Sequence, residues 1–321
     1  MITRNNVSLS EILFYRIGGN ARFLLEATSV DDVFEAVAFL QRNKIEKYIV
    51  IGLGTNLLMP DEDFNGVVIW LKAPRKEDIH LTNDGLISSF AGQTLDELIH
   101  FGFHNSLIGL EALGGLPSSI GGAIRGNAGA FGVEMEDVVV KVEVLSIVNE
   151  TYTIKEFTQE ECEFTYRDSF FKHNSQYIIL KGFFHLEPVE KEGLVRAKKI
   201  YLSHIEYRTK NHPVEFPSCG SVFKNITKKE QVAKILAVWP DMKEDVDRKW
   251  HGKASMGYVI KRLGFSGLQV GGAKITDKHA NYISNVSNAS ASDVKEIIEQ
   301  IKKKFFETFA FYPELEAEVV M

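Results

Sequence analysis

The chain contains few of the features that mark metalloproteins, secreted proteins and membrane proteins. It has only two cysteines, Cys162 and Cys219, and their positions form no metal-ligand spacing. No apolar run approaches the roughly 18 residues that would span a bilayer, and the residues after Met1 lack the apolar stretch of a secretory signal. We therefore expect reduced thiols, no bound metal, no membrane insertion and a cytoplasmic location.

Positive charge is not in excess either. Lysine and arginine number 37 against 43 aspartates and glutamates, which gives a net charge of −6, and they form no basic arm or stripe. Because nucleic acids are bound through clustered positive charge, a nucleic-acid partner is disfavoured. The remaining composition is that of a soluble globular protein, with 45% hydrophobic and 25% charged residues. A length of 321 residues allows two or more cores.

The most informative segment is 114–132, in which seven of nineteen residues are glycine and Arg125 carries the only charge. Its Leu, Ile, Pro, Ala and Phe residues are not typical of a solvated linker, so we predict a packed loop whose backbone passes close to a ligand. Successive N–H groups in such turns bind anions, commonly phosphate. A second glycine loop, Gly52–Leu57, lies upstream. Together the loops indicate a bound dinucleotide, although either loop alone is equally compatible with an ordinary tight turn.

Apolar periodicity predicts the elements around these loops. Helices are expected to begin at Ser29, which can cap a first turn, and at Thr94, which can form a capping box with Glu97. A last amphipathic helix is predicted over 294–305. Strands are predicted at 48–51, 67–71, 138–145, 177–180 and 315–320, and a further helix is expected to start within 188–199.

The common nucleotide motifs do not fit the first glycine loop. A Rossmann fingerprint starting at Gly52 and Gly54 would need a third glycine where Leu57 stands. A Walker A loop would need Gly-Lys-Ser/Thr, whereas Gly54 is followed by Thr55 and Asn56. Both common phosphate-binding folds are therefore disfavoured.

The chain resembles the UDP-N-acetylenolpyruvoylglucosamine reductase family over nearly its whole length. The similar motifs, in the family's order, are Arg16–Gly19, Gly52–Leu58, Gly121–Gly132, Tyr166–Ser169, Pro217–Asn225, Val270–Ala273, Lys278–Ile283 and Leu315–Val319. Each motif alone has modest specificity, but a chance match of all of them in this order is very rare. The spacing between the Tyr166 and Ser221 motifs resembles the shorter subtype, which lacks an extra tyrosine-bearing loop.

The resemblance implies an α+β fold with an FAD-binding domain of the vanillyl-alcohol-oxidase (PCMH) type, at about 16–187. This domain would form two lobes, 1–72 and 73–187. An α+β substrate-binding domain would follow at 188–311, and a C-terminal strand at 312–321 would carry the catalytic glutamate.

The resemblance also implies a reaction in two halves. NADPH would reduce non-covalently bound FAD, and the flavin would pass a hydride to C3 of UDP-N-acetylglucosamine enolpyruvate, giving UDP-N-acetylmuramate for peptidoglycan-precursor synthesis. Arg167 would stabilise the developing enolate, Ser221 would protonate C2, and Glu318 would support the enol form. Taken alone, these residues are better explained by a surface ion pair with Asp168, a turn serine and a solvated strand face.

Binding residues follow from the same resemblance. Tyr166, Lys224 and Asn225 would contact the diphosphate or sugar of the substrate, whereas His279 is interpreted as a packing residue. We expect a monomer. The residues implied to bind FAD are Gly52, Gly54, Thr55, Asn56, Leu57, Gly121, Gly122, Asn127, Ala128 and Gly129.

One departure from the family pattern leaves alternatives open. Ile226 stands where the family usually has proline, and the segment 226–253 that follows is unusually long, which suggests a local lid or a contact surface. One alternative is an FAD-dependent oxidoreductase acting on another substrate, against which the joint presence of Arg167, Ser221 and Glu318 argues. The other is a flavin-binding interaction protein that has lost turnover. The segment 226–253 is the only support for the latter.

Overall fold

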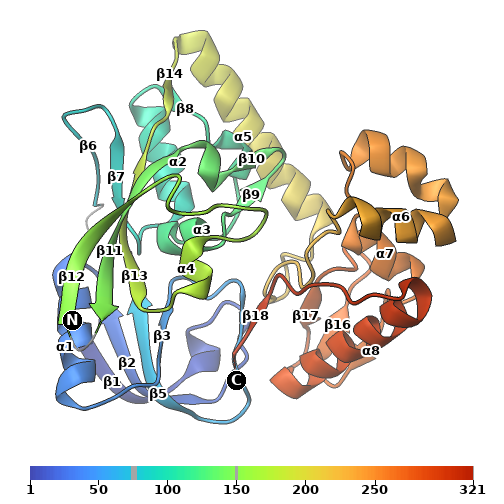
Figure 1. Ribbon diagram of the computed structural model, residues 1–321, viewed down its shortest axis with the longest axis horizontal. Helices are drawn as coiled ribbons and strands as arrows, with labels where there is room; N and C mark the ends of the chain where they lie inside the picture. The colour runs from blue at the N-terminus through green and yellow to red at the C-terminus, as the bar shows by residue number, and fades with distance from the viewer. Residues whose placement is uncertain (74–77, 149–150, 321) are drawn as a thin grey trace. The chain divides into compact units, whose positions relative to one another are not determined.

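The computed structural model describes residues 1–73, 78–148 and 151–320, which form two compact units (Figure 1). The first unit comprises Met1–Val7, Ala21–Leu53 and Phe64–Arg208. The second unit comprises Ser8–Asn20, Gly54–Asp63 and Thr209–Met321. Residues 74–77 and 149–150 of the predicted second lobe, and Met321 of the predicted C-terminal strand, lie outside the described residues.

One sheet of the first unit has the strand order β1-β2-β5-β3. Its strands are β1 (Ile2–Ser8), β2 (Asn20–Ala27), β5 (Phe64–Leu71) and β3 (Tyr48–Ile51). Because β5 pairs in parallel with both β2 and β3, the chain must cross over between β2 and β3, and α1 (Val30–Arg42) supplies the crossover. Ser29 caps α1 by accepting a hydrogen bond from the Asp32 amide at 3.2 Å, as predicted.

The second sheet of this unit is antiparallel, with the order β12-β11-β13-β7-β6. Its strands are β6 (Ile79–Leu81), β7 (Ile87–Phe90), β11 (Val139–Val148), β12 (Thr151–Thr158) and β13 (Tyr177–Phe184). The capping box of Thr94 and Glu97 begins α2 (Leu95–His104), as predicted. The unit also contains the short strand pairs β8 (Leu107–Ile108) with β14 (Glu187–Pro188) and β9 (Gly129–Ala130) with β10 (Val133–Glu134), and the helix α4 (Phe170–His173). The long helix α5 (Lys191–Asn211) belongs to this unit as far as Arg208.

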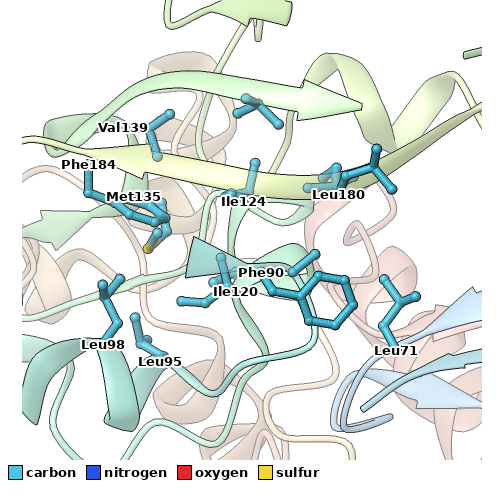
Figure 2. Close-up of a cluster of buried hydrophobic side chains, with 14 of the residues drawn as sticks. Leu71, Phe90, Leu95, Leu98, Ile120, Ile124, Met135, Val139, Leu180 and Phe184 are labelled. Atoms are coloured by element: carbon cyan, nitrogen blue, oxygen red, sulfur yellow. The ribbon is translucent and has the colours of Figure 1, made fainter. Parts of the chain in front are cut away.

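We expected the glycine-rich segment 114–132 to be a packed loop because of its composition. Part of it is helical instead. Its middle forms the short helix α3 (Ile120–Arg125), which Ser119 caps by accepting from the Gly122 amide at 3.2 Å. Ile120 and Ile124 are fully buried, and Figure 2 shows them in the same cluster as Phe184 and Leu180 of β13. The apolar residues between the glycines thus anchor the segment to the sheet.

The second unit contains a three-stranded antiparallel sheet of β15 (Gln269–Val270), β16 (Ala273–Ile275) and β17 (Ile283–Asn285). A second pair joins β4 (Leu57–Leu58) in parallel to β18 (Glu318–Val319), so only two residues of the predicted strand 315–320 are paired as a strand. The helices are α6 (Lys229–Val238), α7 (Met256–Arg262) and α8 (Ala291–Phe309). The apolar stripe predicted over 294–305 is the buried face of α8.

The segment 226–253 packs into the core of the second unit. Val232, Ile235, Met242 and Val246 are all buried in the core of that unit. The ring of Trp239 meets the ring of Phe309 edge to face, with 4.9 Å between centroids. The extra length therefore adds apolar contacts to α8.

Candidate active site

Within the first unit, the two glycine segments lie in contact where Gly52 meets Ser119. Gly52 follows the last residue of β3, and a Cβ built on it would lie only 1.9 Å from the Ser119 Oγ atom. No side chain fits there. Because the same Oγ caps α3, a larger residue at position 52 would also displace the start of the helix that carries Gly121 and Gly122.

Gly121 and Gly122 differ in what surrounds them. Gly121 is buried, and a Cβ on it would lie 3.0 Å from the Ala91 Cβ, so packing explains this glycine. Gly122 is exposed, and its closest contact would be Ser119 Oγ at 3.1 Å. A helical glycine costs roughly 0.5–1 kcal/mol relative to alanine. The exposed backbone of Gly122 at the start of α3 leaves a space that a Cβ would fill. Such a space fits the pyrophosphate of a dinucleotide.

The rest of the first glycine loop belongs to the second unit. Gly54 has φ +65°, in the left-handed region that glycine tolerates best. Asn56 donates from Nδ2 to the Glu316 carbonyl at 3.0 Å, and the Glu318 amide donates to the Asn56 carbonyl at 2.9 Å. Leu57 is the strand partner of Glu318. The predicted cofactor loop and the predicted catalytic glutamate are thus joined backbone to backbone.

Arg167 is held firmly within the first unit. Its Nη1 atom donates to Glu134 Oε1 at 3.2 Å and to the Asn127 carbonyl at 3.4 Å, and its Nη2 donates to the Gly129 carbonyl. The guanidinium carbon lies 5.0 Å from the centre of the Tyr166 ring. These four neighbours therefore fix the plane of the guanidinium. The backbone of Arg167 has φ +57°, in the left-handed region. This arrangement is more than the surface ion pair that the local sequence suggests.

Asn127 organises this arginine pocket. It is fully buried, and its Nδ2 donates to Glu134 Oε2 at 3.1 Å and to the Thr165 carbonyl at 3.0 Å. Its Oδ1 accepts from the Glu136 amide at 3.0 Å. The side chain is thus occupied by protein partners, and the predicted cofactor contact of Asn127 stays a prediction.

Ser221 follows Gly220, which has φ +75°, and is partly exposed. Cys219, two residues earlier, is 2% exposed, and burial raises the pKa of its thiol to about 12. Because the thiol is buried, Cys219 is a poor substitute for Ser221 as a donor to a bound substrate. Lys224 is partly exposed, and Asn225 accepts from the Met256 amide at 2.9 Å and so caps α7. The substrate contacts of Lys224 and Asn225 stay predictions.

The second unit brings the serine segment and the glutamate segment together. The Glu316 and Ala317 amides donate to the Val222 carbonyl at 2.8 and 3.2 Å, and Phe223 forms an isolated bridge with Leu315. Tyr166 and Arg167 belong to the first unit. The contact of Glu134 with Arg167 was not predicted. In the sequence, Glu134 stands out only as an acidic residue just after the glycine-rich segment.

His279 has the surroundings of a packing residue, as we interpreted it. Burial lowers the pKa of its imidazole, which favours the neutral form. Its ring lies 5.2 Å from that of His212 and 4.9 Å from that of Tyr282, measured between centroids. Among residues 1–73, 78–148 and 151–320, no group of three or more His, Cys, Asp or Glu side chains has the arrangement of a metal site.

Comparisons with known proteins agree along the whole chain. The family model of an FAD binding domain matches residues 21–152, and that of the UDP-N-acetylenolpyruvoylglucosamine reductase C-terminal domain matches 212–321. The reductase of Carboxydothermus hydrogenoformans is 36% identical over 98% of this chain and 93% of its own length, and that of Bacillus subtilis is 31% identical over the same shares. The crystal structure of the Thermus caldophilus reductase covers 100% of both chains with 27% identity and a TM-score of 0.74.

An FAD-binding domain followed by a reductase C-terminal domain defines a flavoprotein oxidoreductase. The chain belongs to the UDP-N-acetylenolpyruvoylglucosamine reductase family. The predicted family and the predicted α+β fold with an FAD-binding domain are therefore confirmed. Within the described residues, no helix is long and apolar enough to cross a membrane.

Proposed function

We propose that this protein is an NADPH-dependent flavoenzyme that reduces UDP-N-acetylglucosamine enolpyruvate to UDP-N-acetylmuramate in peptidoglycan-precursor synthesis. The observation that carries the proposal is 36% identity to such a reductase over 98% of the chain. We assign the FAD-binding lobes to 1–72 and 73–187, the substrate domain to 188–311 and the catalytic strand to 312–321. The enzyme acts as a cytoplasmic monomer.

FAD, when bound, supplies the hydride chemistry, accepting a hydride from NADPH and delivering it to the substrate. The chain's part is to bind and orient this group. In this proposal the exposed backbone at Gly122 lies against the pyrophosphate, and Gly52, Gly54 and Gly121 belong to the same FAD site. The remaining flavin contacts in this proposal are Thr55, Asn56, Leu57, Asn127, Ala128 and Gly129.

Three side chains act on the substrate in this proposal. Arg167, as a fixed planar cation, stabilises the negative charge that develops beside the substrate carboxylate. Ser221 donates its hydroxyl proton to C2. Glu318 accepts a hydrogen bond from the enol form, while Tyr166, Lys224 and Asn225 hold the diphosphate or sugar.

A two-step titration under anaerobic conditions tests the function. The purified protein should be yellow, lose its absorbance near the flavin maximum on addition of NADPH, and regain it only when UDP-N-acetylglucosamine enolpyruvate is added. Bleaching without recovery would indicate an oxidoreductase with another substrate. A yellow protein that NADPH does not bleach would indicate a flavin-binding protein without turnover.

We expect FAD to be released intact by acid precipitation. Covalent attachment needs a His, Cys or Tyr side chain near the isoalloxazine, and neither glycine segment contains His or Cys. The supernatant should hold all of the flavin, measured by its absorbance. Yellow colour in the washed pellet would contradict this expectation.

Gly122→Ala should weaken FAD binding by more than about tenfold, which corresponds to 1.4 kcal/mol. The added methyl would stand on the exposed first turn of α3, where the backbone should face phosphate, with its Cβ 3.1 Å from the Ser119 Oγ atom, which must shift slightly. Flavin titration of the apoprotein measures the loss, and its melting temperature checks that the fold is kept. Gly126→Ala, at the other end of the helix, is the control because its Cβ would lie an ordinary 3.4 Å from the Gly122 carbonyl. Equal flavin affinity of both variants would show that the pyrophosphate lies elsewhere.

A further inference from the structure

Asn281 is a buried polar residue to which the mechanism above gives no role. It is 3% exposed. Its carbonyl accepts from the Val222 amide at 2.8 Å, its Oδ1 accepts from the Phe223 amide at 3.0 Å, and its Nδ2 donates to the Phe223 carbonyl at 2.8 Å. One residue thus binds the two residues that directly follow Ser221.

The same short segment is also bonded to the chain just before Glu318. The Val222 carbonyl accepts from the Glu316 amide at 2.8 Å, and the Lys224 amide donates to the Glu314 carbonyl at 2.9 Å. The backbone at 222–224 is therefore held on two sets of partners, Asn281 and residues 314–317. Ser221 directly precedes the segment 222–224, and Glu318 directly follows residues 314–317.

We propose that Asn281 is a positioning residue that fixes Ser221 for proton transfer, an inference that rests on the proposed function. The Asn281 carboxamide satisfies both the backbone amide and the backbone carbonyl of Phe223, as a neighbouring strand would, because it offers one acceptor and one donor. A serine hydroxyl is a weak acid, so its usefulness depends on where it is held. If the donor to Phe223 is lost, the buried carbonyl loses its partner and the turn that presents Ser221 relaxes.

Asn285 provides a matched control. It is 9% exposed, its Oδ1 accepts from the Ala289 amide at 2.8 Å, and its Nδ2 donates to the Tyr15 and Arg16 carbonyls at 3.3 Å. It is the same residue type in the same unit, and its carboxamide holds a different segment. Its backbone amide donates to the Pro217 carbonyl at 2.8 Å, a bond that a change of side chain leaves in place. Asn281→Asp and Asn285→Asp each keep the acceptor, remove the donor and preserve the size of the side chain.

The experiment compares the two half-reactions of flavin-loaded wild-type, Asn281→Asp and Asn285→Asp proteins in anaerobic stopped flow. Asn281→Asp should slow reoxidation by the enolpyruvyl substrate at least about tenfold and leave reduction by NADPH within about threefold, since only the former needs Ser221. Asn285→Asp should leave the ratio of the two rates unchanged. Amide hydrogen exchange should rise at Val222 and Phe223 in Asn281→Asp alone. If the aspartate variant does not fold, Asn281→Gln replaces it in the experiment. Its longer side chain misplaces the same donor and acceptor, so we expect the same result.

The Ser221→Ala background tests whether Asn281 acts through Ser221. There the added Asn281→Asp change should slow reoxidation by no more than about threefold, because the group it positions is already gone. Multiplicative losses, or equal slowing of both half-reactions by Asn281→Asp, would overturn the inference. A wild-type protein that the enolpyruvyl substrate fails to reoxidise would instead overturn the proposed function.

Discussion

Ser221→Ala should slow reoxidation of the enzyme by the enolpyruvyl substrate by about 10²–10⁴-fold, the usual contribution of a positioned acid. Reduction by NADPH involves no protonation at C2, so its rate should stay close to that of the wild type. Anaerobic stopped flow at the flavin absorbance measures both rates on one preparation. The variant keeps the backbone at Gly220 and the bonds of Val222, so the loss reports the hydroxyl itself.

Cys219→Ala is the control for this experiment, because the Cys219 thiol lies two residues from Ser221 in the chain and is the candidate substitute donor. Its thiol is only 2% exposed, and this burial, which also raises its pKa to about 12, keeps it from contacting a bound substrate. The alanine variant should therefore lose some stability but keep both half-reaction rates. Equal slowing of the two halves by Ser221→Ala would show instead that Ser221 mainly holds the flavin.

Local features of the fold could be read from the sequence with little error. The caps at Ser29 and Thr94 and the stripe of α8 depend on residues a few positions apart, and all three are found where predicted. The helix α3 was missed because glycine content suggested a loop. The cap at Ser119 is a local signal, but the burial of Ile124 against β13 is a long-range contact that no local pattern gives.

The site itself depends on contacts between residues distant in sequence. Glu134 and Arg167 are 33 positions apart, and Asn281 and Phe223 are 58 apart, so no periodicity could pair them. The roles of Arg167, Ser221 and Glu318 came from the resemblance to a family and not from their neighbours in the chain. What the structure adds is the set of residues that hold them, namely Asn127, Glu134 and Asn281.

Arg167→Lys should remain impaired in the second half-reaction, by about 10²–10³-fold, even though it keeps the positive charge. The guanidinium uses two nitrogens to reach Glu134 and the Asn127 and Gly129 carbonyls, which sets its plane. A lysine ammonium is a point charge on a flexible stem and cannot hold those acceptors and present a planar fork to a carboxylate as well. The loss should appear in the rate of reoxidation at saturating enolpyruvyl substrate, with flavin content unchanged.

Arg262→Lys separates this effect from the general cost of removing a forked ion pair. Arg262 also binds a carboxylate with two nitrogens, at 2.6 and 3.0 Å from Asp241, and its guanidinium carbon lies 4.5 Å from the Trp239 ring centre. It has no part in the proposed mechanism, so its lysine variant should lose stability at most and keep both rates. If Arg167→Lys is as active as Arg262→Lys, then charge alone suffices at position 167. The planar geometry that Glu134 enforces would then have no catalytic purpose.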